Sequence, residues 1–219
     1  AVGAPVRWTE ATGFQSLGQV FTGSNNGRAL AANSDGTIVV GTGYNDIAGF
    51  GRGFRWSQDG GYAVFPNLAR IDAITPDGQW MGSMTQQSEP VRVSASGALL
   101  LLDPSPSRFD GAAPLAMSDD GRVIVGTARQ SSGEQTLFVW TESDGMNSLT
   151  DYLAARGIIL PSDFTLETQS LRCSADGLVF SGNALNSQLL VEGWVAIVPA
   201  PSTLVGSLCL AALALRRRR

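Results

Sequence analysis

The chain has 219 residues, with 15 basic and 19 acidic side chains, two cysteines and no histidine. Every basic residue is an arginine and four of them end the chain, so the body before them carries 11 arginines against 19 carboxylates. An acidic body repels nucleic-acid backbones. A chain without histidine cannot form a Ser-His-Asp or Cys-His nucleophilic system or an imidazole-based zinc site. We therefore expect no nucleic-acid partner, and we assign no catalytic residue, no cofactor and no metal ligand.

An Asp-Gly motif followed by a short apolar run and a further glycine recurs in the body. Its copies are Asp35-Gly36, Asp77-Gly78, Asp120-Gly121 and Asp176-Gly177. Asp-Gly between apolar runs is typical of hairpins with a type I′ turn, in which both central residues have positive φ. Aspartate also hydrogen-bonds its own backbone in turns, so we interpret these residues as structural rather than as a catalytic or calcium-binding set.

A second element, Phe-x-Trp or a variant of it, follows each copy, and then come a turn and a short apolar strand. Pro90–Ser94 is a degenerate version, and Val6–Thr9 is a version that lacks its upstream half. The pattern predicts an all-β, propeller-like fold of about four four-stranded units with a leading half-unit. A fixed place in each repeat indicates core packing between sheets for the tryptophans of this element, Trp8, Trp56, Trp140 and Trp194.

The repeat spacing predicts one propeller-like domain over residues 1–198. We expect a partial unit and four further units, at residues 1–27, 28–68, 69–104, 112–150 and 171–198. The longer last spacing indicates an insertion at 151–170, in which Thr150 would cap a short helix from Asp151 to Arg156. Because the first unit opens at its middle, we expect a fragment of a longer propeller.

The C-terminal residues 199–219 form a tail of three parts in order. A Pro-rich segment is followed by the apolar run Leu204–Leu215 and then by four arginines. As a helix the run would cover about 18 Å, which is less than a comfortable bilayer crossing. We expect a short transmembrane helix over 204–215 that serves as a temporary hold, with the arginines as a cytoplasmic stop.

This order of parts resembles the PEP-CTERM tail of exported proteins of Gram-negative bacteria, although Ala200 stands where that family usually has Glu. The resemblance implies export, a transient hold in the inner membrane, and release to the cell surface or extracellular space by an exosortase-like membrane protease. The sorting residues that it implies are Val198, Pro199, Ala200, Pro201, Ser202, Arg216, Arg217, Arg218 and Arg219.

The Asp-Gly-x-Val-Val-Gly and Phe-x-Trp motifs together resemble the extracellular HAF-repeat proteins over most of residues 6–198. That family implies a secreted propeller-like β-protein without a defined activity. We therefore expect a binding or structural protein of the cell envelope, with an extracellular polysaccharide or other surface proteins as partners. Two alternatives stay open: an extracellular carbohydrate-active enzyme with a carboxylate pair, and a membrane-tethered scaffold.

Overall fold

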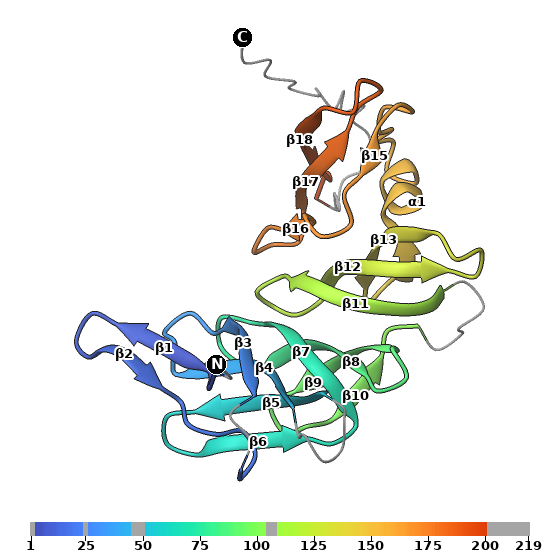
Figure 1. Cartoon of the computed structure of the whole chain (residues 1–219). Coiled ribbons are helices and arrows are strands. Elements are labelled where there is room, and N and C mark those ends of the chain that lie inside the picture. Colours follow the sequence, from blue (N-terminus) through green and yellow to red (C-terminus); the bar gives the residue numbers. More distant parts are fainter. Residues whose placement is uncertain (1–2, 24–25, 45–50, 104–108, 201–219) are drawn as a thin grey trace.

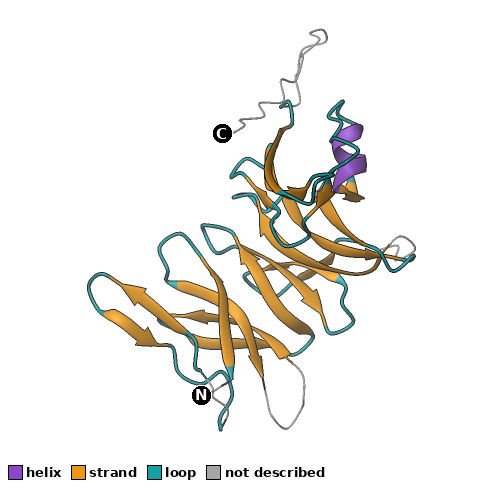
Figure 2. Ribbon diagram, turned by 45° about the horizontal axis from the view of Figure 1, so that its top comes forward, coloured by secondary structure: helices purple, strands orange, loops and turns teal. Residues whose placement is uncertain are grey.

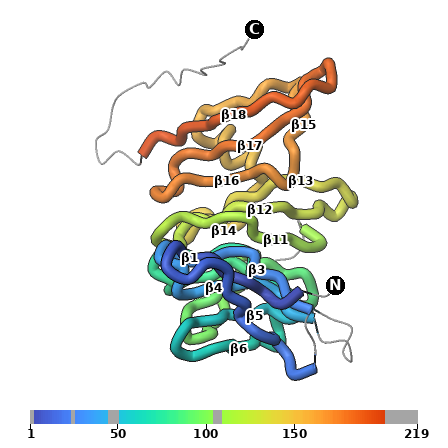
Figure 3. The backbone as a smooth tube through the Cα atoms, turned by 60° about the vertical axis from the view of Figure 1, so that its left-hand side comes forward, coloured from blue at the N-terminus to red at the C-terminus, as the bar shows by residue number. Residues whose placement is uncertain are grey.

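The computed structural model describes residues 3–23, 26–44, 51–103 and 109–200, and this part of the chain is built from strands and one short helix (Figure 1). A two-stranded hairpin is followed by four larger antiparallel sheets. In Figure 1 the hairpin and the sheets formed by residues 6–101 occupy the lower part of the molecule and the sheets formed by residues 109–197 the upper part, and in Figure 3 the last sheet again lies at the end opposite to the cyan strands. The predicted fold, a partial propeller of repeated antiparallel units, is confirmed.

The leading hairpin, here called unit 0, pairs β1 (Val6–Thr9) with β2 (Gly13–Ser16). Units 1 to 3 are sheets of four strands in chain order. Unit 1 contains β3 (Gly27–Ala32), β4 (Ile38–Tyr44), β5 (Gly51–Ser57) and β6 (Gly61–Phe65). Unit 2 contains β7 (Leu68–Ile74), β8 (Trp80–Thr85), β9 (Pro90–Ser94) and β10 (Leu99–Leu101). Unit 3 contains β11 (Phe109–Met117), β12 (Val123–Gln130), β13 (Gln135–Thr141) and β14 (Gly145–Ser148).

Unit 4 has a different construction. Its central strand β17 (Val179–Leu185) pairs along one edge with β18 (Val191–Ile197). Its other edge pairs first with β15 (Thr165–Leu166) and then with β16 (Arg172–Cys173). These two short strands together take the place of the first strand of units 1 to 3. The predicted boundaries are therefore wrong here, because part of the supposed insertion at 151–170 belongs to the sheet.

The helix α1 (Leu149–Ala154) begins two residues earlier than expected. Ser148, not Thr150, is its N-cap, since the Ser148 hydroxyl accepts a hydrogen bond from the Asp151 amide at 3.1 Å. Leu149 and Leu153 are fully buried on one face. The helix packs between units 3 and 4, where its buried side chains join the apolar layer formed by strands of both units.

The hydrophobic core is divided into layers between consecutive units, and Figure 2 shows the sheets face to face. Val39 and Phe54 pack in the layer toward unit 0, whereas Val40 packs in the layer toward unit 2. Neighbouring residues of a strand point to opposite faces, so a sheet inside the stack buries both faces. This is why the second strands of units 1 and 3 begin with continuous apolar runs, at residues 38–40 and 123–125, instead of an alternating pattern.

The Asp-Gly hairpins are five-residue connections and not the predicted type I′ turns. Only the glycine has positive φ, at 69°, 71°, 69° and 70° in units 1 to 4. A hydrogen bond from the glycine amide to the carbonyl three residues earlier closes each turn, as from Gly121 to Ser118 at 3.0 Å. A longer connection needs one left-handed residue per hairpin instead of two, and glycine supplies it without a steric penalty.

Candidate functional site

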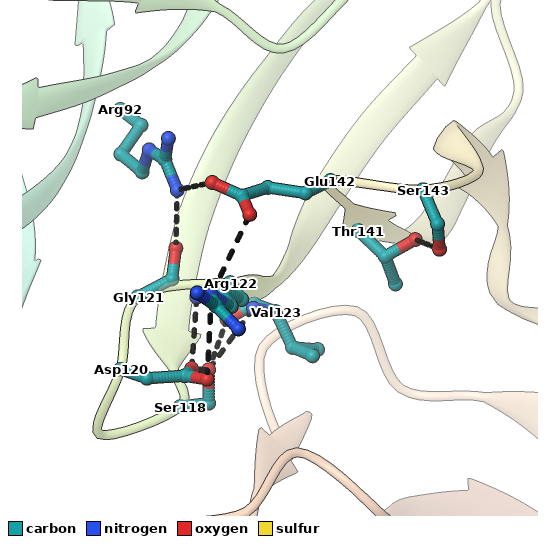
Figure 4. Close-up of polar contacts among 9 residues, drawn as sticks. All are labelled: Arg92, Ser118, Asp120, Gly121, Arg122, Val123, Thr141, Glu142 and Ser143. Atoms are coloured by element: carbon teal, nitrogen blue, oxygen red, sulfur yellow. Dashed lines mark hydrogen bonds and ion pairs between the residues drawn. The ribbon is translucent and has the colours of Figure 1, made fainter. Parts of the chain in front are cut away.

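The Asp-Gly turns of units 2 to 4 share one hydrogen-bond pattern, which Figure 4 shows for unit 3. Asp120 Oδ1 accepts hydrogen bonds from the Arg122 amide at 3.0 Å and from the Ser118 hydroxyl at 2.6 Å. The Ser118 hydroxyl in turn accepts from the Val123 amide at 3.0 Å. Thr75 and Ser174 take the place of Ser118 in units 2 and 4. The aspartates are thus tied to their own turns.

These contacts also decide the charge of the turn carboxylates. The hydroxyl of Thr75 lowers the pKa of Asp77, and the hydroxyl of Ser174 lowers the pKa of Asp176, each with help from a backbone amide. Hydrogen bonds to the ionised form favour it, so these side chains are charged anchors rather than proton donors. Among the described residues no three acidic or cysteine side chains come together in a way that could hold a metal ion.

The tryptophans predicted to form the repeated core differ in their surroundings. Trp140 and Trp194 are buried, at 5% and 7% exposure, and Trp56 is half-buried. Trp8, in contrast, is 61% exposed. The core prediction is therefore wrong for Trp8, because no described sheet covers its side of the hairpin.

Trp194 is also not the counterpart of Trp140. In unit 3, Phe138 pairs with Gly126, the closing glycine that follows the apolar run of the Asp-Gly motif, and Trp140 pairs with Ile124. In unit 4 it is Trp194 that pairs with the closing glycine, Gly182. Trp194 therefore occupies the phenylalanine position of the repeat, and a small residue, Ala196, occupies the tryptophan position.

The middle residue of the Phe-x-Trp element forms a contact that the sequence pattern does not predict. Arg92 of unit 2 has a side chain only 9% exposed, and its guanidinium lies 4.3 Å from the Trp80 ring and 5.1 Å from the Trp140 ring. Its Nη1 donates to the Gly121 carbonyl at 3.1 Å and to Glu142 Oε1 at 2.7 Å (Figure 4). We call this contact between consecutive units the arginine clamp.

The same clamp joins unit 0 to unit 1. Arg7 lies 5.2 Å from the Trp56 ring and donates to the Gly36 carbonyl at 3.5 Å and to Gln58 Oε1 at 2.9 Å. Trp56, Gly36 and Gln58 are the counterparts of Trp140, Gly121 and Glu142 in the repeat. At two unit boundaries, therefore, a tryptophan ring, a glycine carbonyl and a polar side chain of the following unit contact one arginine of the preceding unit.

The remaining unit boundaries use other chemistry. Arg55 stands in the clamp position between units 1 and 2, but Val93 replaces the tryptophan there; among the described residues Arg55 Nε, like Arg92 Nε in the clamp, is buried without a hydrogen-bond partner. Between units 3 and 4 the clamp position holds Val139, which packs in one apolar layer with Ala196 and Val198.

The described residues include Val198 but not most of the predicted tail. Val198, expected as the first sorting residue, is 5% exposed, and its amide donates to the Leu178 carbonyl at 2.8 Å, so it belongs to the folded domain. Pro201, Ser202, the run 204–215 and the four terminal arginines lie outside the described residues. Within those residues, no helix is long and apolar enough to cross a bilayer.

Two adjoining hollows between units 2 and 3 are the best candidate for a ligand site. They lie at the ends of the sheets away from the Asp-Gly turns, have volumes of about 260 and 220 Å³, and share Ser88, Asp110 and Gly111. Ser88 has a φ of 65° and its carbonyl accepts from the Ala112 amide at 2.9 Å, so a strained turn shapes the wall. The remaining charged or amide side chains of the lining are Gln87, Glu89, Asp103, Arg129 and Gln135.

A buried carboxyl group lies elsewhere. Burial raises the pKa of Asp72 to about 6, and Arg70, whose Nε is 2.9 Å from Asp72 Oδ2, offsets this only in part. Asp72 occupies a β-bulge of β7, five residues before the turn aspartate, where the other units carry Leu30, Leu115 and Leu171. It does not line the hollows at Ser88. Asp72, the carboxyl group with the raised pKa, therefore lies apart from the acid-lined hollows.

We expect Asp72→Leu to stabilise the chain at pH 7.5 and to remove a pH dependence. The folded chain holds the Asp72 proton more tightly than the unfolded chain, so this group favours folding below pH 4, and that contribution is lost as the pH rises toward 6. The raised pKa corresponds to a destabilisation of at most about 3 kcal/mol at neutral pH. The turn aspartates have lowered pKa values and titrate below this window.

Urea unfolding at several pH values between 4 and 7.5 measures this effect. Asp77→Asn serves as the control, since it removes a carboxylate but should keep the decline in stability between pH 4 and 6. An unchanged decline in the Asp72→Leu variant would assign it to another group.

Comparison with known proteins gives the fold but no family. No protein-family profile matches the chain, and no curated protein matches it. Among solved structures, TolB from Acinetobacter baumannii superposes with a TM-score of 0.57 at 13% identity, over 87% of this chain and 45% of that one. The shared architecture is a propeller of antiparallel sheets. The fold is that of a partial β-propeller.

Two further structures show the same likeness. A prolyl endopeptidase matches with a TM-score of 0.60 at 10% identity, over 90% of this chain and 31% of its own. A TolB protein from Agrobacterium tumefaciens matches with a TM-score of 0.51 at 15% identity, over 80% of this chain and 61% of its own. The chain spans less than two thirds of each of these structures, and identities this low establish the propeller fold alone.

Proposed function

We propose that the chain is an exported β-propeller protein of binding or structural type, sorted to the cell surface by an exosortase-like membrane protease. The observation that carries the proposal is the order of the tail: a Pro-rich segment, the apolar run 204–215, and four arginines at the end. The tail would tether the chain to the inner membrane and hold it until cleavage. This order supports a transient stop better than a lasting anchor, since the run is short for a bilayer.

The body supports a binding or structural role. Its repeated aspartates are tied to turns, and its repeated arginines and tryptophans join consecutive units, so the residues that recur serve the architecture. The surface that these contacts do not use is available to a binding partner. The hollows at Ser88 and Asp110 would be the contact for an extracellular polysaccharide or another surface protein, because carboxylates and amides there offer hydrogen bonds to hydroxyl or cationic groups.

The test is the intact mass of the protein recovered from the surface of its native cells. We expect a species that ends between Pro199 and Thr203, together with a larger processed fraction for Ala200→Glu, which restores the usual residue of the sorting motif. Replacing the four terminal arginines with serine should abolish the processed species, because the cationic stop is lost.

Full-length protein held in the inner membrane, with no effect of Ala200→Glu, would contradict sorting. It would favour the membrane-tethered scaffold.

A further inference from the structure

One face of unit 0 is uncovered and apolar. Val6, Trp8 and Phe14 are 51%, 61% and 80% exposed. Val6 and Trp8 alternate on β1, and Trp8 pairs directly with Phe14 across the hairpin, so all three lie on the same side. Arg7, between them, points the other way and forms the clamp with unit 1. We call the uncovered side the Trp8 face.

The Trp8 face carries two of the three groups that receive an arginine in the clamp. In unit 3 these two groups are Trp140 and, two residues later, Glu142, which hold Arg92 together with the Gly121 carbonyl. In unit 0 the same spacing places Glu10 two residues after Trp8, and Glu10 is exposed. A tryptophan ring beside a carboxylate is suited to a guanidinium by cation–π attraction and by a charge-assisted hydrogen bond.

The free edge of β1 lies beside this face. β1 pairs with β2 along one edge, and among the described strands none pairs with the other. A hollow of about 360 Å³ lies there, lined by β1, by Ala29–Ala32 of β3 and by the first Asp-Gly turn. In unit 3 the corresponding edge of β13 is filled by β12. An open edge bordered by apolar surface is a site for strand addition.

A second copy of this chain is a poor occupant of the Trp8 face. Head-to-tail stacking would bring up unit 4, in which Val195 stands in the clamp position, paired with Ser181 as Val139 is paired with Val125. Val195 is 58% exposed and apolar. Stacked on unit 0 it would bury Glu10 against a hydrocarbon side chain, and an unpaired buried carboxylate is costly.

We propose that the Trp8 face binds a further unit of the same repeat, which places an arginine over Trp8, paired with Glu10, while two strands that follow that unit pair with the free edge of β1. The occupant is thus defined by its chemistry: an antiparallel sheet with arginine at the position of Arg92, followed by two strands that complete the sheet of unit 0. This inference concerns the propeller itself and does not depend on export or sorting.

A graft tests the proposal within one chain. A second copy of residues 68–134, which contains unit 2 with Arg92 and the first two strands of unit 3, is placed directly before Gly3 of the chain. Trp8 lies 132 positions before Trp140, so β1 then continues the grafted strands as β13 does in unit 3. Hydroxyl-radical footprinting read by mass spectrometry reports Trp8 and Trp140 separately, because each lies in a peptide that occurs once in the grafted chain.

We expect the modification rate of Trp8 to fall toward that of Trp140 in the grafted chain. Arg92→Ala in the grafted copy should restore most of the Trp8 reactivity, and its effect on stability should not add to that of Glu10→Gln. A folded graft in which Trp8 stays as reactive as in the original chain would overturn the proposal.

A second variant covers the case in which the graft does not fold. Val195→Arg changes one exposed side chain and supplies the missing arginine to unit 4. Sedimentation should then show head-to-tail association that Glu10→Arg abolishes and that the exchange Val195→Glu with Glu10→Arg restores. If the unsubstituted chain already associates and Trp8→Ser abolishes this, a second copy is the occupant and the proposal is wrong. Absence of association in Val195→Arg, with an unfolded graft, also overturns it.

Discussion

Gly126→Ala is expected to destabilise the chain by about 3 kcal/mol, because the site is overpacked by a single methyl group. Gly126 lies in the central strand β12, opposite Pro114 on one side and Phe138 on the other. A Cβ atom at this position would collide with the carbonyl oxygen of Ala113 and with the Phe138 ring. The ring is fully buried and the carbonyl is backbone, so neither can move aside cheaply.

Equilibrium urea unfolding followed by tryptophan fluorescence measures the change. Gly193→Ala is the matched control, since a Cβ there meets nothing within 4 Å and the residue has no positive φ; we expect a change of about 0.5 kcal/mol or less. Equal stability of the two variants would show that β11 and β12 are not as closely apposed as described.

Arg92→Ala is expected to destabilise the chain by about 2 to 3 kcal/mol. The substitution removes two cation–π contacts and the hydrogen bonds to Gly121 and Glu142. The loss stays below the cost of breaking a fully buried ion pair, because the Glu142 side chain is 46% exposed and is solvated when its partner is gone. Trp80 and Trp140 lose the flat side chain that fills the space between them.

Arg92→Lys should recover only part of this stability, since an ammonium lacks the planar group that stacks on aromatic rings. Arg122→Ala is the matched control: its side chain is 68% exposed, and its ion pair with Glu142 at 3.5 Å is a surface contact. Thermal unfolding of the three variants at one salt concentration provides the comparison. Arg92→Ala and Arg122→Ala of equal stability would exclude a structural role for the clamp.

The sequence predicted the repeat well because its signals are local. Asp-Gly with a following apolar run marks the hairpin between the first and second strands of each unit, and the structure places a hairpin at all four copies. The apolar runs lack alternation because both faces of the inner sheets are covered. The turn type was missed, since a motif of two residues does not specify the length of the connection.

The features that the sequence could not reveal depend on how the strands pair. Trp194 was aligned by its letter with Trp140, whereas its register opposite Gly182 puts it in the phenylalanine position. The place of Asp72 at a bulge likewise depends on a register shift within β7. Thr165–Leu166 joins the last sheet through only two residue pairs, too few for a periodic signal.

The sequence alone shows the recurring arginine of the clamp but not its partners. Arginine stands between the two outer positions of the element in three copies, at Arg7, Arg55 and Arg92. Its partners lie in the following unit, however, at a tryptophan and at a residue two positions further on, and only the stacking of the sheets brings these groups together.

The claim that consecutive units are joined through the clamp is tested most directly by a double-mutant cycle of Arg92→Ala and Glu142→Gln. We expect a coupling energy of about 1 kcal/mol or more, since the two groups lie 2.7 Å apart and belong to different units. A parallel cycle of Arg92→Ala with Glu134→Gln, on the exposed turn after β12, should be additive. Additivity within about 0.3 kcal/mol in both cycles would contradict the clamp.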